Sequence, residues 1–296
     1  MSVPQVDRPG ADAAAGAVGL PEVIRRSTAY LERHGVHSAR ANVEALLMHL
    51  LDTDRAGLYA RRRGLDTATA KALGRALCRR CSGTPLQHIT GEQAFLGLRL
   101  RVEPGVFVPR PETEVVATVA IDALEGVPRP TVVDIGTGTG AIALAIARAR
   151  PDARVLATDV SSAAVSLARE NARRLGLSVE VRRGALLAPV LVRERGHVDM
   201  LVSNPPYLTR QEHRTLPREV RREPFEALVG GTTLHAGLAG LAPAWLRRGG
   251  WLVMEIGDDQ ASEVRSLVGA AGLTEVEVLP DLAGRDRVVG ARRPRA

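Results

Sequence analysis

The run Ser203-Asn204-Pro205-Pro206-Tyr207 combines residue types that can hold a weakly nucleophilic nitrogen. An amide nitrogen is a poor nucleophile because its lone pair is delocalised into the carbonyl, so a site that alkylates it must orient that lone pair. The side-chain oxygen of Asn204 and the backbone carbonyl of Pro205 can each accept one N–H, while the two prolines stiffen the loop. Tyr207 offers a flat face to a planar group. The pattern predicts that Asn204, Pro205, Pro206 and Tyr207 carry catalysis by positioning an amine or amide for methyl transfer.

A glycine-rich run, Gly136-Thr137-Gly138-Thr139-Gly140, follows one apolar segment and opens another. Glycine allows a sharp turn and a close approach of ligand to backbone, and a helix start behind it presents unpaired amides. The run alone does not choose a cofactor, because Gly-x-Gly-x-x-Ala also fits dinucleotide-binding proteins. Asp159, which ends the next predicted strand, can accept both hydroxyl protons of an adenosine ribose. A plain helix cap is the alternative interpretation of this aspartate.

Strand-like and helix-like segments alternate from Glu112 onward, which predicts a mostly parallel sheet with helices on both faces. The predicted strands are 131–135, 154–158, 179–182, 199–203, 251–256, 274–279 and 287–291, and the clearest helices are 141–150 and 162–175. The last two strands are joined by a short loop and must pair antiparallel, because a parallel crossover needs about a dozen residues. We expect an α/β fold: a Rossmann-like seven-stranded methyltransferase sheet, parallel with a terminal antiparallel hairpin. Ligands bind beyond the carboxyl ends of such strands, where the glycine run, Asp159 and Asn204 are predicted to meet.

The chain before this sheet carries no chemical motif of its own. Residues 1–19 are rich in Ala and Gly and predict a disordered tail rather than a secretory signal. Residues 20–84 have apolar side chains at helical spacing and predict a small N-terminal helical domain. Residues 85–111 change to short extended pieces and predict a β-hairpin linker to the catalytic domain, 112–296.

The composition restricts the class of protein and its partners. Hydrophobic residues make up 45% and charged residues 25% of the chain, and no apolar run approaches the roughly 20 residues that span a bilayer, so we expect a cytoplasmic protein with no membrane partner. The net charge of +7 would suit nucleic acid, yet three Phe, three Tyr and two Trp are too few for a stacking platform. We expect no direct nucleic-acid binding, with an acidic or RNA-associated partner left open. Cys78 and Cys81 lack the further ligands of a zinc site and are interpreted as reduced thiols, with no metal expected.

Several further stretches make the pattern specific to one family. They are Pro85-Leu86-Gln87-His88-Ile89-Thr90-Gly91, the block from Phe107 to Glu114 (Phe-Val-Pro-Arg-Pro-Glu-Thr-Glu), Asp134 to Ala141, Val202 to Tyr207, and Asp281 to Arg287. With them, residues 20–293 resemble the HemK/PrmC-type protein-glutamine methyltransferases, which modify the Gly-Gly-Gln motif of peptide chain release factors. The Pro-Arg-Pro-Glu-Thr-Glu block is particular to that family.

The resemblance implies S-adenosylmethionine as the cofactor and a peptide chain release factor as the protein substrate. It also implies that the helical domain, 20–84, helps to choose this substrate. Asn204 to Tyr207 then hold the glutamine amide. The residues implied to bind the cofactor are Gly136, Thr137, Gly138, Thr139, Gly140, Asp159, Leu186 and Asn204.

Two segments depart from the family pattern and keep alternatives open. Ala185 stands where the family has an acidic residue that accepts from the adenine amino group, although Leu186 can still pack against the ring. The segment from Gly230 to Leu238 is longer than the family's Gly-Gly-x-Asp-Gly-Leu and lacks its aspartate. One alternative is a paralogue that methylates another protein or a small-molecule nitrogen. Another is a nucleic-acid amino-group methyltransferase, although the N-terminal 110 residues are too small and too poor in aromatics to grip a flipped base. A non-catalytic protein is disfavoured by the intact Asn-Pro-Pro-Tyr.

Overall fold

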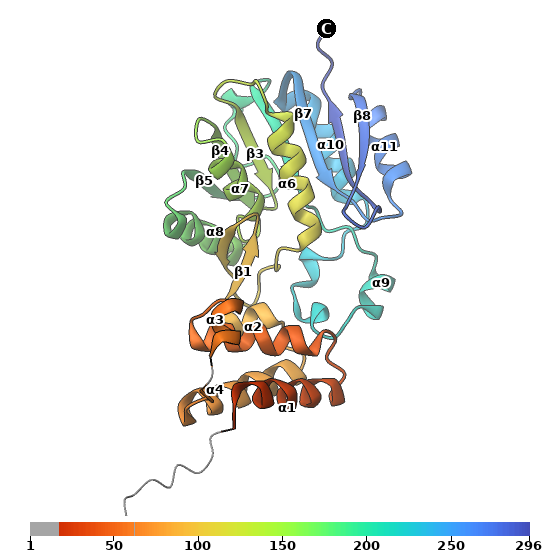
Figure 1. The fold of residues 1–296 in the computed structure, drawn as a ribbon. Coiled ribbons are helices and arrows are strands. Elements are labelled where there is room, and N and C mark those ends of the chain that lie inside the picture. The colour runs from red at the N-terminus through yellow and green to blue at the C-terminus, as the bar shows by residue number, and fades with distance from the viewer. Residues whose placement is uncertain (1–17, 62) are drawn as a thin grey trace, which may run out of the picture. The chain divides into compact units, whose positions relative to one another are not determined.

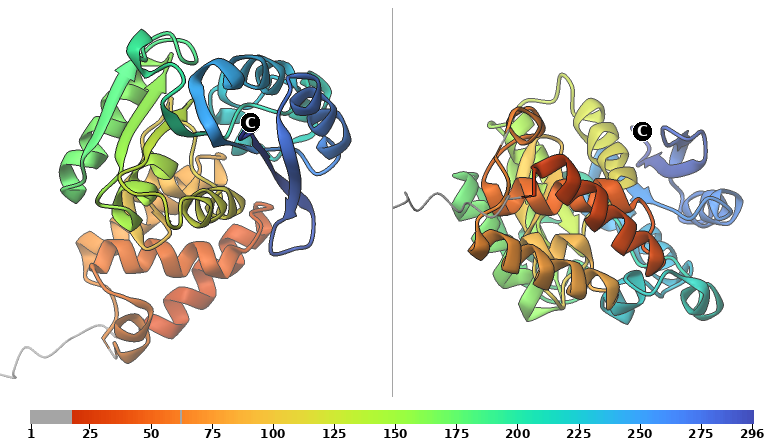
Figure 2. Two further views of the ribbon diagram at one scale, coloured as in Figure 1. Left: turned by 90° about the horizontal axis from the view of Figure 1, so that it is seen from above. Right: turned by 60° about the horizontal axis from the view of Figure 1, so that its bottom comes forward.

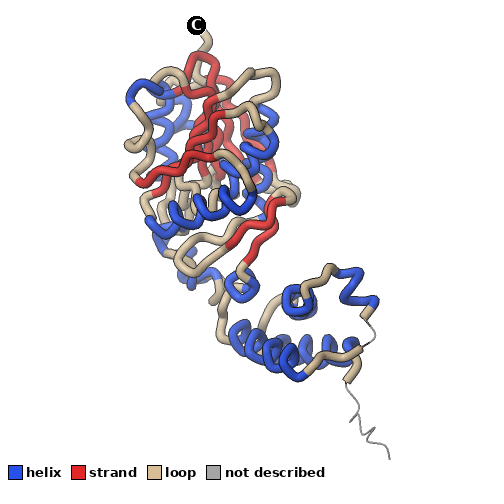
Figure 3. Tube along the Cα trace, turned by 90° about the vertical axis from the view of Figure 1, so that its left-hand side faces the viewer, coloured by secondary structure: helices blue, strands red, loops and turns tan. Residues whose placement is uncertain are grey.

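The protein is described by a computed structural model that covers residues 18–61 and 63–296. Residues 1–17, which make up most of the predicted tail, lie outside the described residues. The chain divides into two compact units, Met1–Thr90 and Gly91–Ala296. Figure 3 shows every described strand in the second unit, whereas the described part of the first consists of helices and loops.

The first unit contains the helices α1 (Leu20–Arg33), α2 (Ala39–Leu51), α3 (Arg55–Ala60), α4 (Thr67–Cys81) and α5 (Leu86–Thr90). Helices α1, α2 and α4 pack against one another (Figure 2) around a core that includes Leu31, Leu46 and Leu73. Asp66 caps α4 by accepting from the backbone N–H of Thr69 at 2.9 Å. The apolar spacing of this segment thus builds a helical core of its own.

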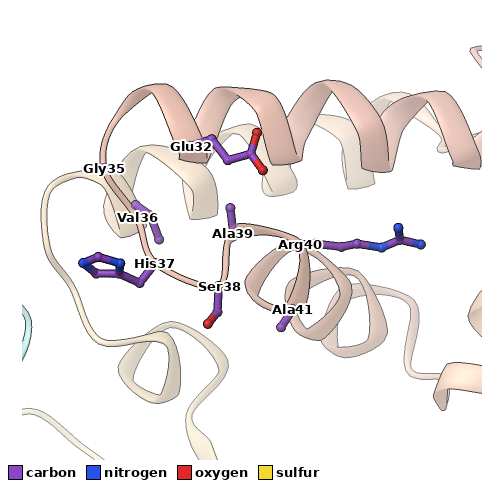
Figure 4. Close-up of a pocket in the computed structure, with 8 residues that line it drawn as sticks. All are labelled: Glu32, Gly35, Val36, His37, Ser38, Ala39, Arg40 and Ala41. Carbon is purple, nitrogen blue, oxygen red and sulfur yellow. The ribbon is translucent and has the colours of Figure 1, made fainter.

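The turn between α1 and α2 surrounds a shallow pocket in this helical unit. Its lining comes from Glu32 and from the residues Gly35 to Ala41. Figure 4 shows Glu32 on α1, before the turn, and Arg40 on α2, after it. Arg40 forms an ion pair with Glu44 at 2.9 Å, so its charge is balanced by a residue of the same helix.

The second unit is built on a seven-stranded sheet. Its strands are β3 (Thr131–Ile135), β4 (Arg154–Asp159), β5 (Val179–Arg183), β6 (Val198–Ser203), β7 (Leu246–Glu255), β8 (Thr274–Pro280) and β9 (Asp286–Arg292). The spatial order is β5-β4-β3-β6-β7-β9-β8, with β5 to β7 parallel and β9 antiparallel to both of its neighbours. This confirms the predicted parallel sheet with its terminal antiparallel hairpin.

Helices cover both faces of this sheet (Figure 1). On one face lie α6 (Pro111–Ala123), α7 (Ala141–Ala149) and α8 (Ser162–Leu175), and on the other lie α10 (Thr233–Trp245) and α11 (Ala261–Ala270). Successive side chains of a strand point to opposite faces, so Val132 joins the first core and Val133 the second. The short helix α9 (Arg210–Thr215) follows β6 and carries a capping box at Thr209 and Glu212. Among the described residues no helix has the length and apolar character needed to cross a bilayer.

The structure differs from the sequence prediction in three elements. Residues 86–90 form the helix α5 rather than an extended piece, and only β1 (Glu92–Phe95) and β2 (Leu98–Arg101) make the antiparallel hairpin. Helix α6 begins at Pro111, since the fixed φ of proline and its missing N–H suit a first helical turn. Strand β7 begins at Leu246, five residues before the predicted strand, because Leu246 pairs with Val198 before an irregularity in the ladder.

Candidate functional site

The glycine run forms the turn between β3 and α7, and its conformation requires glycine. Gly136, Gly138 and Gly140 all have positive φ, at 73°, 57° and 86°. A Cβ on Gly140 would lie 3.0 Å from Cδ1 of Leu144 and 3.3 Å from Cβ of Ala168, so the backbone here approaches the helices too closely for a side chain. The run therefore leaves backbone amides free of covering side chains at the start of α7.

Asp134 anchors this turn from inside the protein. Its carboxylate accepts from the hydroxyl of Thr137 at 2.6 Å and from the backbone N–H of Ala143 at 3.2 Å. Burial raises the pKa of Asp134 to about 7, against these two hydrogen bonds. The buried carboxyl thus joins the turn to the first turn of α7.

Asp159 ends β4 and faces the glycine turn. Its Oδ2 accepts from the backbone N–H of Gly138 at 2.9 Å, and its Oδ1 accepts from that of Ser161 at 2.9 Å. Each carboxylate oxygen keeps a further lone pair, so the side chain can still accept two hydroxyl protons. The Ser161 side chain caps α8 instead, which leaves Asp159 available for a ligand.

A cleft of about 490 Å³ lies at the carboxyl ends of β3, β4 and β6. The predicted site residues that line it are Gly136, Thr137, Gly138, Thr139, Asp159, Leu186, Asn204, Pro205 and Pro206. Gly140 lies behind the cleft at the start of α7, and Tyr207 is not among the lining residues. Ala185 lines the cleft without a carboxylate, and of the described lining residues only Asp159 and Glu226 carry a charge. The structure therefore brings most of the predicted cofactor and substrate residues, but not Gly140 or Tyr207, into one cleft.

The loop after β6 is held on both sides by neighbouring strands and loops. Ser203 donates from Oγ to the carbonyl of Ile135 at 2.7 Å, which ties the end of β6 to the end of β3. Farther along, Gln260 donates to the carbonyl of Tyr207 at 2.8 Å. Gly230 packs so closely on the loop that a Cβ there would lie 2.3 Å from the carbonyl oxygen of Pro206. The Asn-Pro-Pro-Tyr loop is thus fixed by packing as well as by its two prolines.

Asn204 and Tyr207 point to two different buried partners. The amide Nδ2 of Asn204 donates to the hydroxyl of Thr113 at 3.0 Å. The hydroxyl of Tyr207 donates to Oε1 of Glu255 at 3.4 Å, and burial raises the pKa of this phenol, which keeps it a donor. Burial also raises the pKa of Glu255 to about 7. Two titratable groups thus lie beneath the loop.

Glu223 holds a further wall of the cleft. Its carboxylate is buried and accepts from the backbone N–H of Val108 at 3.0 Å and from the guanidinium of Arg110. The segment that it holds includes Phe107 and Pro109, both of which line the cleft. Burial raises the pKa of Glu223, and the Arg110 charge opposes that shift. This acid joins the Phe107 segment to the loop before α10.

Three of these residues are absent from the sequence prediction: Thr113, Glu223 and Glu255. Thr113 belongs to the Pro-Arg-Pro-Glu-Thr-Glu block, which the sequence marks without assigning a role. Glu255 is a charged residue at the end of an apolar strand, a signal that could have pointed to it. For Glu223 no sequence signal separates it from the neighbouring acidic residues. Within residues 18–61 and 63–296 no cluster of three or more His, Cys, Asp or Glu side chains could hold a metal ion.

Two family models match the chain. The Methyltransferase small domain matches residues 97–234, which include all the described lining residues of the cleft except Leu238. The PrmC N-terminal domain matches residues 22–91, most of the helical unit. The two matches correspond to two different parts of the chain.

Curated relatives match over nearly their whole length. The "Release factor glutamine methyltransferase" of Moorella thermoacetica is 43% identical over 286 residues, which cover 93% of this chain and 97% of that protein. The protein of the same name from Deinococcus radiodurans is 40% identical over 280 residues, covering 93% and 98%. Among solved structures, the 16S rRNA N2 G1207 methyltransferase of T. thermophilus in complex with AdoMet and guanosine has a TM-score of 0.52 and 21% identity, covering 68% of this chain and 49% of that one. That likeness supports the fold alone.

Proposed function

Because this chain belongs to the family of release factor glutamine methyltransferases, we propose that it methylates the side-chain amide nitrogen of the glutamine in the Gly-Gly-Gln motif of a peptide chain release factor. It is an S-adenosylmethionine-dependent methyltransferase by family. One observation of the site carries the proposal furthest: the Asn204 and Pro205 acceptors share a single cleft with the glycine turn and Asp159. That arrangement suits the transfer of a methyl group to a neutral nitrogen.

The described residues fit the methyl donor. The bare backbone at Gly136 and Gly138 leaves room for the amino acid part of the cofactor, and Asp159, which faces that turn, would accept from the ribose hydroxyls. Leu186 lines the cleft and would pack against the adenine ring. When bound, S-adenosylmethionine supplies an electrophilic methyl group on a sulfonium centre.

The substrate side of the cleft orients a planar amide without a strong base. Asn204 Oδ1 and the Pro205 carbonyl would each accept one N–H of the glutamine, which fixes the plane of the amide and so directs the perpendicular nitrogen lone pair toward the methyl donor. Pro206 and Phe107 line the same cleft. S-adenosylmethionine, when bound, would supply the methyl group to the amide nitrogen with S-adenosylhomocysteine as the other product, and one N–H proton would pass to solvent at the mouth of the cleft.

The test is methylation of the release factor itself. The protein is incubated with S-adenosylmethionine and a purified release factor, and the Gly-Gly-Gln peptide is analysed by mass spectrometry. We expect a single added methyl on the glutamine side chain, added far more slowly by an Asn204→Ala variant. An unmodified glutamine after prolonged incubation with cofactor-loaded enzyme would overturn the proposal.

A second candidate substrate is a nitrogen of another protein or of a small molecule. The observation that favours it is the altered cleft wall, in which Ala185 replaces an acid and the segment from Gly230 to Leu238 lacks the family's aspartate. Methylation of cell proteins other than the release factor, seen with labelled donor, would favour this candidate. We further propose that the protein acts in the cytoplasm and binds no nucleic acid directly, in keeping with its scarcity of aromatic residues.

A further inference from the structure

Glu223 joins two segments of the cleft wall that lie far apart in the sequence. It is 4% exposed, and its carboxylate accepts from the backbone N–H of Val108 at 3.0 Å, 115 positions earlier in the chain. The same carboxylate pairs with the guanidinium of Arg110, which lies over the ring of Phe107 at 5.1 Å from its centroid. Phe107 lines the cleft, and so does Pro224, the residue after Glu223. One buried carboxylate thus holds both segments of the wall.

The first of these segments leads to the substrate side of the cleft. Six residues after Phe107, the hydroxyl of Thr113 in the first turn of α6 accepts from Nδ2 of Asn204 at 3.0 Å. The chain from Phe107 to Thr113 therefore reaches the Asn-Pro-Pro-Tyr loop at the residue proposed to hold the substrate amide.

The second segment is bonded to the same loop. The backbone N–H of Leu208 donates to the carbonyl of Leu228 at 2.9 Å, and the N–H of Gly230 donates to the carbonyl of Leu208 at 3.0 Å. Residues 107–113, 204–208 and 223–230 thus contact one another in turn, and we call them the acceptor frame. The contact of Glu223 with Val108 and Arg110 closes this frame.

We propose that Glu223 is a positioning residue, which holds the acceptor frame at the width that the substrate amide needs. It acts through the Phe107 and Pro224 segments, because a misplacement of about 1 Å at a reacting group can cost roughly 100-fold in rate. The inference rests on the proposed function, since it takes the Asn204 end of the cleft as the place of the glutamine. The cofactor end is held separately, by Asp159 and the N–H of Gly138 at 2.9 Å.

Glu223→Gln tests the frame by methylation kinetics. Glutamine keeps the volume and can still accept from the N–H of Val108, but it loses the ion pair with Arg110. Hydrogen bonds to charged groups are the stronger ones, so we expect kcat/KM for the release factor to fall by about tenfold to a hundredfold, with a higher KM. The affinity for S-adenosylhomocysteine should stay within about threefold of wild type.

Glu194→Gln is the matched control. Glu194 is 8% exposed and accepts from the guanidinium of Arg154 at 2.8 Å, so it is also a buried acid paired with an arginine. Arg154 begins β4, whereas the cleft lies at the carboxyl ends of the strands. We expect this variant to keep the kinetics of wild type.

Fluorine labelling of phenylalanine gives a readout that needs no methyl acceptor. The chain contains three phenylalanines, Phe95, Phe107 and Phe225, so 4-fluorophenylalanine gives three ¹⁹F signals. Phe107 and Phe225 lie on the two segments that Glu223 joins, and Phe95 is 1% exposed in a core away from this contact. Replacement of each phenylalanine by leucine assigns its signal. We expect Glu223→Gln to shift the signals of Phe107 and Phe225 but not that of Phe95, and Glu194→Gln to shift none.

The failures of this inference and of the proposed function are distinguishable. A wild-type enzyme that leaves the release factor unmodified contradicts the proposed function, whereas the ¹⁹F signals still report the contact at Glu223. Signals of Phe107 and Phe225 that are identical in wild type and Glu223→Gln would overturn the frame. A loss of cofactor affinity with unchanged kcat/KM for the release factor would overturn its assignment to the acceptor. Should Glu223→Gln fail to fold, Arg110→Met breaks the same ion pair from its more exposed partner and carries the same comparisons.

Discussion

Asn204 is the residue on which methyl transfer depends most directly. Removing its side chain in Asn204→Ala deletes one of the two acceptors for the substrate N–H bonds, while the glycine turn and Asp159 remain. One oriented hydrogen-bonding group in a protected site is worth roughly 100-fold to 1000-fold in rate, so kcat should fall by that amount. Single-turnover methylation of the release factor gives the measurement.

Asp159→Ala is the matched comparison, since it should damage the other half of the cleft. Loss of the Asp159 carboxylate removes the acceptor proposed for the ribose and leaves the backbone N–H of Gly138 without its partner. Calorimetry should therefore show weaker binding of S-adenosylhomocysteine by Asp159→Ala and nearly unchanged binding by Asn204→Ala. The reverse pattern would exchange the assigned roles of the two residues.

The buried Asp134 gives the stability of the fold a pH dependence. Its pKa is raised from 3.8 to about 7, so the native state binds a proton that the unfolded chain has already lost. Stability is therefore lost as pH rises through 7, by about 2 kcal/mol between pH 5 and pH 8. Asp134→Asn removes this proton, and its free energy of unfolding should fall less than that of wild type over the same range. Denaturant titrations at both pH values measure the difference, and parallel curves would contradict it.

At the scale of residues, the sequence predicts those groups whose neighbours lie in the same short run. The glycines, Asp159 and Asn204 can be predicted from the sequence, because turns and the ends of strands depend on a few neighbouring residues. Thr113 and Glu255 cannot, because their partners lie 91 and 48 positions away and only the folded sheet brings them together. The assigned roles of the site residues themselves stay predictions.

At the scale of elements, the loop after β6 depends on its packing against the loop before α10. Gly230→Ala would place a Cβ 2.3 Å from the carbonyl oxygen of Pro206, so one of the two backbones must move. A shift of the Pro205 carbonyl removes an acceptor from its place, and misplacement by about 1 Å can cost roughly 100-fold in rate. We expect kcat to fall far more than cofactor affinity.

Gly240→Ala is the control for this variant. Gly240 lies on α10, with open space around the position of its absent Cβ. Alanine in a helix is favoured over glycine by about 0.5–1 kcal/mol, so this variant should be slightly more stable and fully active. Equal activities of the Gly230 and Gly240 variants would show that the contact with Pro206 does not shape the site.

The elements that the sequence predicts well are those whose burial is uniform. The apolar runs of β3, β4 and β6 are buried on both faces, so their extents were predicted almost to the residue. The start of β7 was missed because Arg247, Arg248, Gly249 and Gly250 look like a loop, and the strand extends back to Leu246 only through the pairing of Leu246 with Val198 across an irregularity in the ladder. Helix α5 was missed for a similar reason, since five residues carry too little periodicity to separate a helix from an extended piece.

At the scale of the whole molecule, the cleft and most of the net positive charge lie in different units. Every described residue that lines the cleft lies between Gly105 and Leu238, within the second unit. Residues 18–90 carry 12 Lys or Arg and 6 Asp or Glu, so they hold a net charge of +6 of the chain's +7. We therefore propose that the second unit carries out the reaction and that the helical unit helps to choose its protein substrate.

A chain that begins at Gly91 tests this division. The second unit has its own cores, made of residues from Phe95 to Ala291, and none of their buried members comes from the helical unit. We therefore expect the shortened protein to fold and to bind S-adenosylhomocysteine within about threefold of the full chain, less than one decade or 1.4 kcal/mol.

Its activity should depend on the form of the acceptor. The folded release factor should lose most of its methylation because the basic helical unit is missing. A short Gly-Gly-Gln peptide, which offers no other surface, should be methylated equally slowly by both proteins. Raising the salt concentration should reduce the advantage of the full chain on the folded factor, since screening weakens attraction between charged surfaces. Equal rates of the two proteins on the folded factor, with cofactor binding intact in both, would show that substrate choice resides in the second unit.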